Sequence, residues 1–340
     1  MMAPTIRGRP SRIAYDRGNL QPMIYVDDRR VAAALERGAL IEALDADFQR
    51  DAVVPVRPNF SLGHSDASLL LMPAWDSSPY FGVKLVTVFP QNVAGQPAVN
   101  ACYVLMDSEN GSVRAIMDGH ELTLRRTGAA SALASRFLSR NDCTRLLMVG
   151  TGSLAPHLIE SHCEVRPIDS VRIWGRTPAH AEHIAADLAP ALAQRCVRIE
   201  AATDLREAAG WADIISCATL AREPLIQGQW LHAGQHLDLV GSFKPGMREA
   251  DTAAIQRAEL FVDVRASAMA EAGEIVHALQ TGDIRAAHVL GDLLDLTRAR
   301  HPGRSSAAAI TLFKSVGHAI EDLAAAQLVM APRPDAASPP

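Results

Sequence analysis

The spacing of hydrophobic residues changes along the chain, and the change separates two kinds of secondary structure. Residues 80–90, YFGVKLVTVFP, alternate between two faces and are rich in β-branched side chains, which predicts a strand. The next two apolar runs flank SENGS, in which Asn110 and Gly111 tolerate the positive φ of a tight hairpin turn. This first part of the chain is therefore predicted to be α+β, with an antiparallel sheet.

After Gly119 the pattern becomes an alternation of short apolar runs and helical segments. An alanine-rich helical pattern, ELTLRRTGAASALASRFLSR, comes first. Runs such as RLLMVG, SVRIWG and DIISCAT then alternate with segments such as PAHAEHIAADLAPALAQ. This alternation indicates βαβ units and a parallel sheet, because parallel neighbours need a long crossover connection.

Together these patterns predict an α/β protein with a Rossmann-type, doubly wound parallel sheet and a second, α+β domain. We assign residues 1–125 to the α+β domain and residues 126–305 to the Rossmann domain. Residues 306–330, whose pattern predicts one long helix, are expected to return to the first domain and complete it. Residues 331–340, APRPDAASPP, have the composition of a disordered tail.

The composition argues against several classes of protein. The net charge of −5 gives no electrostatic reason to expect nucleic acid or an anionic membrane as a partner. No apolar run approaches the roughly 20 residues that span a bilayer. The five cysteines are scattered singly, which argues against a disulfide framework and a zinc cluster and favours a reducing cytoplasm.

Residues 150–155, GTGSLA, match the G-x-G-x-x-G/A loop of dinucleotide-binding folds. The loop directly follows the apolar run LLMV and opens a helical segment, as the motif requires. Gly150 permits the tight turn, Gly152 lets the backbone approach a pyrophosphate, and Ala155 permits close packing of helix and strand. The predicted cofactor contacts are Gly150, Thr151, Gly152, Ser153, Leu154 and, at the end of DIISCAT, Thr219.

The end of the next strand carries a guanidinium where NAD enzymes carry a carboxylate. In those enzymes an acidic residue about 20 residues on binds the ribose 2′-hydroxyl, but here Trp174, Gly175, Arg176 and Thr177 follow one another. An arginine pairs bidentately with the 2′-phosphate of NADP and stacks on adenine, and Thr177 adds a hydroxyl. The alternative is that Arg176 is a solvated charge at a strand end. We predict NADPH as the cofactor, with NADH as a weaker one.

Several longer stretches resemble the ornithine cyclodeaminase/μ-crystallin family. They are VPVRPNFSL, FGVKLVTVFPQN, AIMDGHELTLRRTGAASALAS, GQHLDLVGSFKPGMRE and TLFKSVGHAIEDLAAA, and they extend over roughly residues 25–330. The resemblance implies that the N-terminal half is a substrate and dimerisation domain, that the middle is a Rossmann domain, and that the protein is a homodimer.

The resemblance also implies a substrate site with three basic residues. Arg57, in PVRP, and Arg126, in LRRTGAAS, match arginines that bind the substrate carboxylate, with Arg125 as a competing candidate by adjacency. Lys84, in GVKLVTV, matches the active-site lysine. Beside two arginines its pKa would fall, which suits proton exchange with an imine nitrogen. Taken alone, a lysine on this strand would also suit the protection of an exposed sheet edge.

Two positions depart from the cyclodeaminases of this family. Phe243, in VGSFKPG, and Leu70, just before LMP, stand where those enzymes carry an aspartate and a glutamate. Burying the δ-ammonium of ornithine against apolar side chains without a counter-charge would be costly. A cyclic imine carboxylate fits better, because it offers one carboxylate, an apolar ring and a C=N bond that accepts hydride.

The resemblance to the ketimine reductase branch implies reduction of Δ1-pyrroline-2-carboxylate to L-proline, and of Δ1-piperideine-2-carboxylate to L-pipecolate. Two alternatives stay open. One is an ornithine cyclodeaminase or a related amino-acid dehydrogenase that uses NAD, and the other is a non-catalytic protein that binds NADPH or small ligands. Among other polar residues, His64 and His120 are interpreted as structural, and Asp238, Asp263 and Glu274 as strand-end or surface carboxylates.

Overall fold

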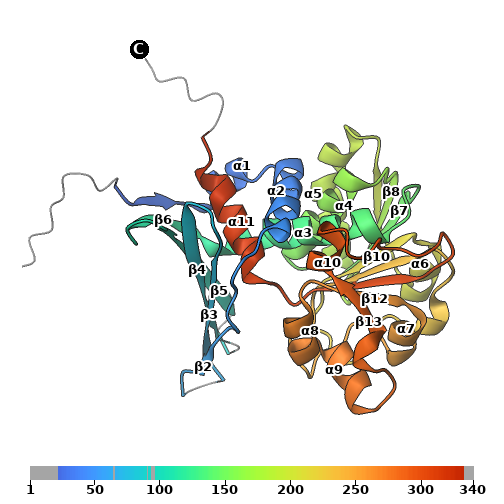
Figure 1. Cartoon of the computed structure of the whole chain (residues 1–340). Helices are drawn as coiled ribbons and strands as arrows, with labels where there is room; N and C mark the ends of the chain where they lie inside the picture. The colour runs from blue at the N-terminus through green and yellow to red at the C-terminus, as the bar shows by residue number, and fades with distance from the viewer. Residues whose placement is uncertain (1–21, 64–65, 90, 93–95, 333–340) are drawn as a thin grey trace, which may run out of the picture.

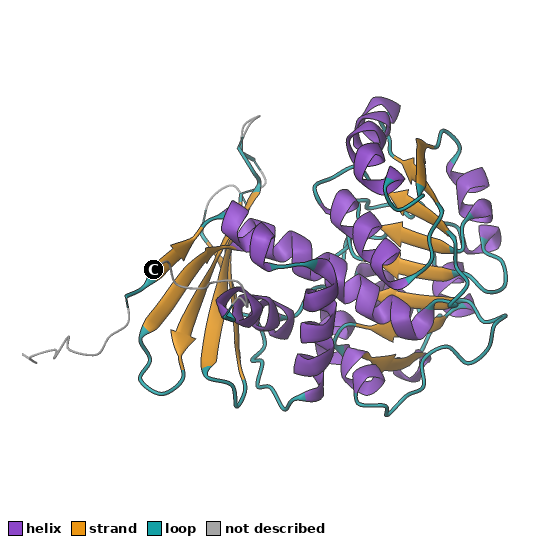
Figure 2. Ribbon diagram, turned by 90° about the horizontal axis from the view of Figure 1, so that it is seen from above, coloured by secondary structure: helices purple, strands orange, loops and turns teal. Residues whose placement is uncertain are grey.

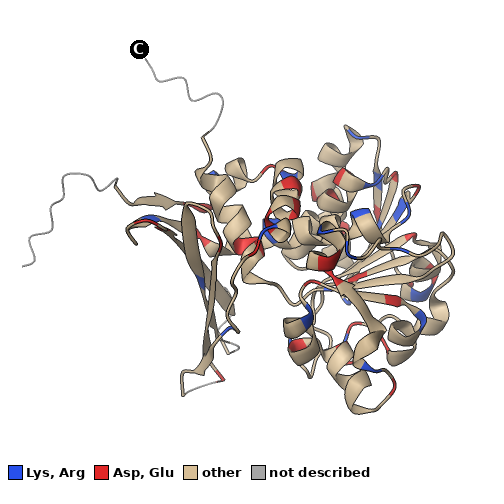
Figure 3. Cartoon of the chain, in the orientation of Figure 1, with Lys and Arg blue, Asp and Glu red and all other residues tan. Residues whose placement is uncertain are grey.

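The computed structural model describes residues 22–63, 66–89, 91–92 and 96–332. Two sheets lie on opposite sides of a central group of helices (Figure 1). Basic and acidic residues are interspersed over both parts (Figure 3). Within the described ranges, every helix is too short or too polar to cross a membrane. His64 lies outside the described residues, as does most of the predicted tail.

The N-terminal sheet has six strands in the order β1-β6-β5-β4-β3-β2. Strands β2 to β6 pair antiparallel in succession, and β1 pairs parallel with β6. The predicted hairpin is confirmed, because β5 and β6 are joined by a turn in which Gly111 has a φ of +73°. The strands are β1 (Ile24–Val26), β2 (Asn59–Ser61), β3 (Ser68–Trp75), β4 (Tyr80–Val88), β5 (Val99–Asp107) and β6 (Val113–Asp118).

Four helices lie on one side of this sheet (Figure 2), where α1, α3 and α11 contact its strands and α2 packs on α3 and α11. They are α1 (Asp28–Ala34), α2 (Arg37–Gln49), α3 (Gly119–Leu138) and α11 (Ala319–Met330). α11 lies between the sheet and α2, and it contacts β3 and β4 as well as α2 and α3. Phe48, Tyr103, Leu133 and Leu323 are among the fully buried side chains of this core, which fixes the position of α11 behind the sheet.

The second sheet has eight parallel strands in the order β13-β12-β14-β11-β10-β7-β8-β9. From β7 the chain first builds outward through β8 and β9, and then returns to add β10 and β11 on the other side, which places a topological switch point between β7 and β10. The strands are β7 (Arg145–Val149), β8 (Ser170–Trp174), β9 (Arg198–Ala201), β10 (Ile214–Cys217), β11 (His236–Leu239), β12 (Glu259–Val262), β13 (Val289–Asp292) and β14 (Thr311–Lys314).

Helices connect these strands and cover both faces of the sheet (Figure 2). They are α4 (Leu154–Val165), α5 (Pro178–Ala193), α6 (Leu205–Trp211), α7 (Thr252–Arg257), α8 (Arg265–Glu271), α9 (Gly273–Gln280) and α10 (Leu293–Thr297), with two 3₁₀ turns, Gly228–Trp230 and Ala286–His288. The predicted fold class, a doubly wound parallel sheet beside an α+β part, is confirmed.

Two predicted boundaries differ from the structure. α3 begins at Gly119, where Asp118 caps it, so a division after residue 125 would cut a continuous helix. Residues 306–330 are not one long helix, because β14 lies between β11 and β12 in the second sheet and only α11 returns to the first. The apolar and β-branched run before Lys314 favours a strand, and Gly317, with a φ of +83°, separates it from α11.

Candidate active site

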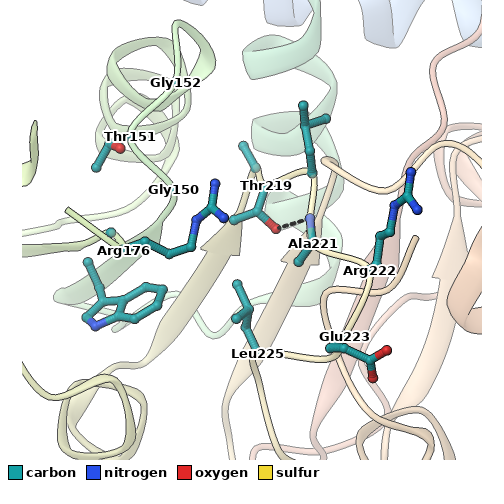
Figure 4. A pocket seen from close by; sticks show the side chains of 13 residues that line it. Gly150, Thr151, Gly152, Arg176, Thr219, Ala221, Arg222, Glu223 and Leu225 are labelled. Atoms are coloured by element: carbon teal, nitrogen blue, oxygen red, sulfur yellow. Dashed lines mark hydrogen bonds between the residues drawn. The ribbon is translucent and has the colours of Figure 1, made fainter. Parts of the chain in front are cut away.

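The candidate cofactor site is a cleft of about 690 Å³ at the carboxyl ends of β7, β8 and β10, beside the switch point. Open parallel sheets bind their ligands at this position. Gly150, Thr151, Gly152, Arg176 and Thr219, all predicted from the sequence, line the cleft and surround one opening in Figure 4. The structure thus brings together five of the eight residues predicted for the cofactor.

The glycine loop has the backbone geometry that its sequence predicts. Gly150 has a φ of +121°, and a Cβ there would lie 2.5 Å from the carbonyl oxygen of Ala218. A Cβ on Gly152 would meet no atom within 4 Å, so the loop leaves space beside its backbone. α4 follows directly, and Ser153 at its N-cap makes no side-chain capping hydrogen bond. Ala155 donates its backbone N–H to the carbonyl of Gly152 and Pro156 has no N–H, so the groups offered to a phosphate at the start of this 12-residue helix are the N–H groups of Ser153 and Leu154.

Three predicted cofactor residues do not line the cleft. Ser153 and Leu154 form the start of α4, where their contribution is the helix terminus rather than a side chain in the cleft. Thr177 is the exposed residue before α5 and makes no side-chain capping hydrogen bond. Ser153 follows the lining residue Gly152, Leu154 is one residue further on, and Thr177 follows the lining residue Arg176.

Arg176 is exposed and directly follows Gly175 at the end of β8. Figure 4 shows its side chain extending across the cleft towards Thr219. Within the described ranges it forms no ion pair, so its guanidinium is available to a ligand. The sequence analysis missed Arg222 and Glu223, which line the same cleft from the segment after β10. Their position could have indicated them, because they follow the predicted contact Thr219 by three and four residues.

A buried carboxylate, Glu249, holds the segment that carries Thr219. It accepts hydrogen bonds from the backbone N (2.7 Å) and the hydroxyl (3.0 Å) of Thr219, and from the backbone N of Gly241 (2.8 Å) and Ser242 (3.2 Å). Lys314 Nζ lies 3.8 Å from Glu249 and donates to Ser242 Oγ at 2.6 Å. Burial raises the pKa of Glu249 to about 7, and Lys314 opposes this shift.

Three carboxylates expected at strand ends or on the surface are all buried, which corrects the surface assignment: Asp238 and Asp263 are 0% exposed and Glu274 is 1% exposed. Asp263 does follow the end of β12, whereas Asp238 lies within β11 and Glu274 in α9. Asp238 accepts hydrogen bonds from the hydroxyls of Ser131 and Ser216. Asp263 accepts hydrogen bonds from two backbone N–H groups just after β14, those of Val316 and Gly317. Glu274 accepts from the hydroxyl of Ser242, the residue before Phe243, and from the backbone N–H of Glu249. These long-range donors, invisible in the sequence, compensate the burial.

The candidate substrate site is a cavity of about 160 Å³ between the first sheet and the loop after β11. All five residues predicted for this site line it, namely Arg57, Leu70, Lys84, Arg126 and Phe243. The other lining residues are Met72, Val86, Val88, Val99, Ala101, Gly119, His120 and Thr123. Among the described residues, no aspartate or glutamate lines the cavity. His120, interpreted from the sequence as structural, is one of its walls.

Lys84 lies on β4, between β3 and β5, so the alternative role at an exposed sheet edge is excluded. Its side chain is 2% exposed. Nζ lies 2.8 Å from Oδ1 of Asp322 and 3.3 Å from the hydroxyl of Thr123. Burial and the Arg126 guanidinium lower the pKa of Lys84 to about 8, against the opposing effect of Asp322. This is the direction that the sequence analysis expected.

Arg126, rather than its neighbour Arg125, faces the cavity. It lies inside α3, and not before a helix start. Its Nε donates to Asp322 at 2.9 Å and its Nη1 to Glu321, while Nη2 has no protein acceptor within the described ranges. Arg125 instead pairs with Glu121 at 2.6 Å and donates to the carbonyl of Leu35. The structure therefore resolves the ambiguity that adjacency left.

Arg57 connects the two parts of the molecule. It precedes β2, and its Nε and Nη2 donate to the carboxylate of Glu271 at the end of α8, with Nε at 3.2 Å. Its Nη1 keeps no protein acceptor among the described residues. Arg57 and Arg126 thus each retain one guanidinium nitrogen for a ligand carboxylate.

The described fold, with both of these sites, corresponds to one known protein family. The model of the ornithine cyclodeaminase/mu-crystallin family matches residues 24–333. The chain belongs to this family. A relative, the Δ1-pyrroline-2-carboxylate reductase of Paracoccus denitrificans, is 38% identical over 292 residues, which are 82% of this chain and 91% of the relative.

Solved structures of the family have the same fold. The Δ1-pyrroline-2-carboxylate reductase of Thermococcus litoralis, in complex with NADH and L-proline, matches with a TM-score of 0.86 and 31% identity, over 90% of this chain and 96% of that one. An archaeal alanine dehydrogenase dimer with bound NAD matches with a TM-score of 0.83 and 26% identity, over 90% and 94% of the two chains.

The sequence analysis missed the acidic residues behind the cavity. Glu321 and Asp322 on α11 are 0% exposed, and each contacts Arg126. Burial raises the pKa of Glu321 to about 7, although Arg126 opposes the shift. The stretch GHAIED, residues 317–322, contributed to the family resemblance, but no function was predicted for its two acidic residues. A charged pair in an otherwise apolar helix segment is itself a sign of a buried ionic contact.

Proposed function

We propose that this member of the family reduces Δ1-pyrroline-2-carboxylate to L-proline, and also Δ1-piperideine-2-carboxylate to L-pipecolate. One observation carries the proposal: Arg57, Lys84 and Arg126 converge on a small cavity whose other walls are mainly apolar. The free nitrogens of the two arginines suit one carboxylate, and the side chains of Leu70 and Phe243 suit a saturated ring.

The residues present fit a nicotinamide dinucleotide, which supplies a hydride to the imine carbon when bound. The chain supplies orientation and a proton. Arg57 and Arg126 hold the carboxylate, and Lys84 donates a proton to the imine nitrogen, because an iminium accepts hydride more readily than a neutral imine. A lysine with a pKa of about 8 carries that proton at neutral pH and releases it readily.

Ornithine fits the same cavity poorly. Its second ammonium would enter a space that already holds three cationic groups, and no carboxylate among the described residues lines that space. Asp322 lies behind Lys84 and is already shared between Lys84 and Arg126. An added cation would therefore lack a partner, which argues against cyclodeamination.

We further propose that NADPH is preferred over NADH. The support is the free guanidinium of Arg176 at the end of β8, in a position where a carboxylate would repel the 2′-phosphate. The related Thermococcus litoralis enzyme is in complex with NADH, so the preference is a property proposed for this chain alone.

A homodimer through the outer face of the first sheet is the third part of the proposal. Successive residues of a strand point to opposite faces of the sheet, so every second residue of β3, β4 and β5 points away from the helices. This outer face includes two rows of paired residues: Leu71, Leu85 and Cys102, and Pro73, Val83 and Val104. The four helices lie on the opposite face (Figure 2). An apolar sheet face without a covering layer is typical of a subunit interface, and a family member of known structure is a dimer.

To test the proposal, purified protein is incubated with each cyclic imine and either NADPH or NADH, and oxidation of the nicotinamide is followed by its absorbance. We expect rapid oxidation with both imines and a higher kcat/KM with NADPH. Release of ammonia from ornithine, together with an inert imine, would instead identify a cyclodeaminase. Binding of NADPH without turnover of any imine would identify a binding protein. The mass in solution, measured by light scattering for the protein and for Val83→Asp, tests the dimer.

A further inference from the structure

The chain has only three lysines, Lys84, Lys244 and Lys314, among 33 basic residues. The ammonium of Lys84 is enclosed by protein at the back of the cavity. Its shortest contact is the 2.8 Å hydrogen bond to Oδ1 of Asp322, and the hydroxyl of Thr123 is more distant at 3.3 Å. Since nearly all other basic residues of the chain are arginines, which do not release a proton, the lysine at position 84 points to a role for a cation that can.

One oxygen atom holds both cationic groups of the cavity floor. Oδ1 of Asp322 accepts from Lys84 Nζ at 2.8 Å and from Arg126 Nε at 2.9 Å. Asp322 itself is 0% exposed and does not line the cavity, and its Oδ2 has no hydrogen-bond partner among the described residues. Without this carboxylate, an ammonium and a guanidinium would stand side by side in a desolvated space and repel each other.

We infer that Asp322 is a positioning residue: its carboxylate fixes the Lys84 ammonium beside the Arg126 guanidinium and keeps Lys84 protonated until a substrate arrives. This inference rests on the proposed function for its chemical meaning. A neutral residue at 322 would leave Lys84 in place sterically but would favour its neutral amine.

The chemical step is balanced without a proton on Asp322. The Lys84 N–H bond breaks and an N–H bond forms at the imine nitrogen, which leaves Lys84 as a neutral amine. A reduced nicotinamide held by the glycine loop and Arg176 would supply the hydride, and with it the two electrons, so that the imine is reduced as the nicotinamide is oxidised. Lys84 then regains a proton from water as the product leaves.

The charged and titratable groups that face Lys84 come from four directions. α11 contributes Asp322 and, farther away, Glu321; α3 contributes Arg126 and His120; β5 contributes Tyr103; and the segment before β2 contributes Arg57. Burial raises the pKa of Tyr103, so its phenol stays neutral. Among the acidic groups Asp322 has the larger effect on the pKa of Lys84, because Glu321 contacts Arg126 and not Lys84.

The experiment titrates the lysines directly. Protein labelled with carbon-13 at lysine Cε should give three signals, one of which is assigned to Lys84 by its loss in Lys84→Arg. We expect Asp322→Asn to move the Lys84 titration to lower pH by about one unit or more, and the matched variant Glu321→Gln to move it much less. An unchanged titration in Asp322→Asn would overturn the inference.

Asp322→Glu covers the case in which Asp322→Asn does not fold. It keeps the charge but displaces the oxygen, so we expect the Lys84 titration to stay near that of the native protein while kcat falls about tenfold or more. An undiminished kcat would overturn the positioning role. If the lysine titration shifts as expected but the native protein reduces no cyclic imine, the proposed function fails and the inference about Lys84 stands. If imine reduction is present and the titration does not move, only the inference fails.

Discussion

Glu249 and Thr219 are joined by two hydrogen bonds, since one carboxylate oxygen accepts from both the backbone N (2.7 Å) and the hydroxyl (3.0 Å) of Thr219. The other oxygen accepts from Gly241 and Ser242, which precede Phe243 in the chain. Thr219 lines the cofactor cleft and Phe243 lines the substrate cavity. A single buried carboxylate therefore holds both the segment that lines the cofactor cleft and the loop that lines the substrate cavity, and the proposed hydride transfer requires these two sites to be close together.

Glu249→Gln should weaken both sites at once. In the variant, an amide NH2 group would replace one of the two carboxylate oxygens that accept from Thr219, Gly241 and Ser242. Each buried donor left without an acceptor costs about 1–3 kcal/mol. We expect a lower melting temperature and higher KM values for both NADPH and the imine. Glu182→Gln, an exposed glutamate on α5, is the control and should change none of these. Loss of imine affinity alone would contradict the linking role.

Arg126→Lys should raise the KM for the imine with little effect on cofactor affinity. A lysine lacks the planar, spread guanidinium whose Nε and Nη1 reach Asp322 and Glu321 while Nη2 faces the cavity, so its ammonium would keep the buried acids and lose the contact with the substrate carboxylate. Hydrogen bonds to charged groups are worth about 1.5–3 kcal/mol, or roughly a ten- to hundredfold change in affinity. Arg125→Lys is a control at the adjacent position, because Arg125 pairs with Glu121 outside the cavity. Equal effects of the two substitutions on KM would contradict the assignment.

These two arginines show how far the sequence could predict the site. Motif and resemblance placed Arg57, Lys84 and Arg126 in one cavity, but they could not separate Arg126 from Arg125, because the helix phase depends on where α3 begins and what it packs against. Asp322 was missed for the same reason: its partners, Lys84 and Arg126, are 238 and 196 residues away in the chain. The strand β14 was hidden because four residues cannot establish a period.

Arg176→Asp should move cofactor preference towards NADH. The new carboxylate would repel a 2′-phosphate and could accept a hydrogen bond from a ribose 2′-hydroxyl. We expect the ratio of kcat/KM for NADPH to that for NADH to fall about a hundredfold, equivalent to ~2.7 kcal/mol. The control is Arg206→Asp, which makes the same charge change at an exposed position on α6. A ratio that moves equally in both variants would indicate a general charge effect rather than contact with the 2′-phosphate.

The pH dependence of stability tests the buried acid Glu321. Its pKa is raised from 4.5 to about 7 by burial, despite Arg126. The folded protein therefore holds a proton that the unfolded chain releases, so the contribution of Glu321 to stability is present below about pH 4.5 and is lost as the pH rises through about 7. Glu321→Gln removes this dependence.

We therefore expect Glu321→Gln to gain stability relative to the native protein as the pH rises across this interval, by at least about 1 kcal/mol, because each unit of pKa shift corresponds to ~1.4 kcal/mol. Urea unfolding at several pH values measures the difference, and Glu182→Gln on the surface should show a difference that does not vary with pH. A difference for Glu321→Gln that stays constant with pH would mean that Glu321 is ionised throughout, with Arg126 fully compensating its burial. In that case Arg126 would contact two permanently ionised carboxylates, Asp322 and Glu321, and the pKa of Lys84 would depend on both of them rather than mainly on Asp322.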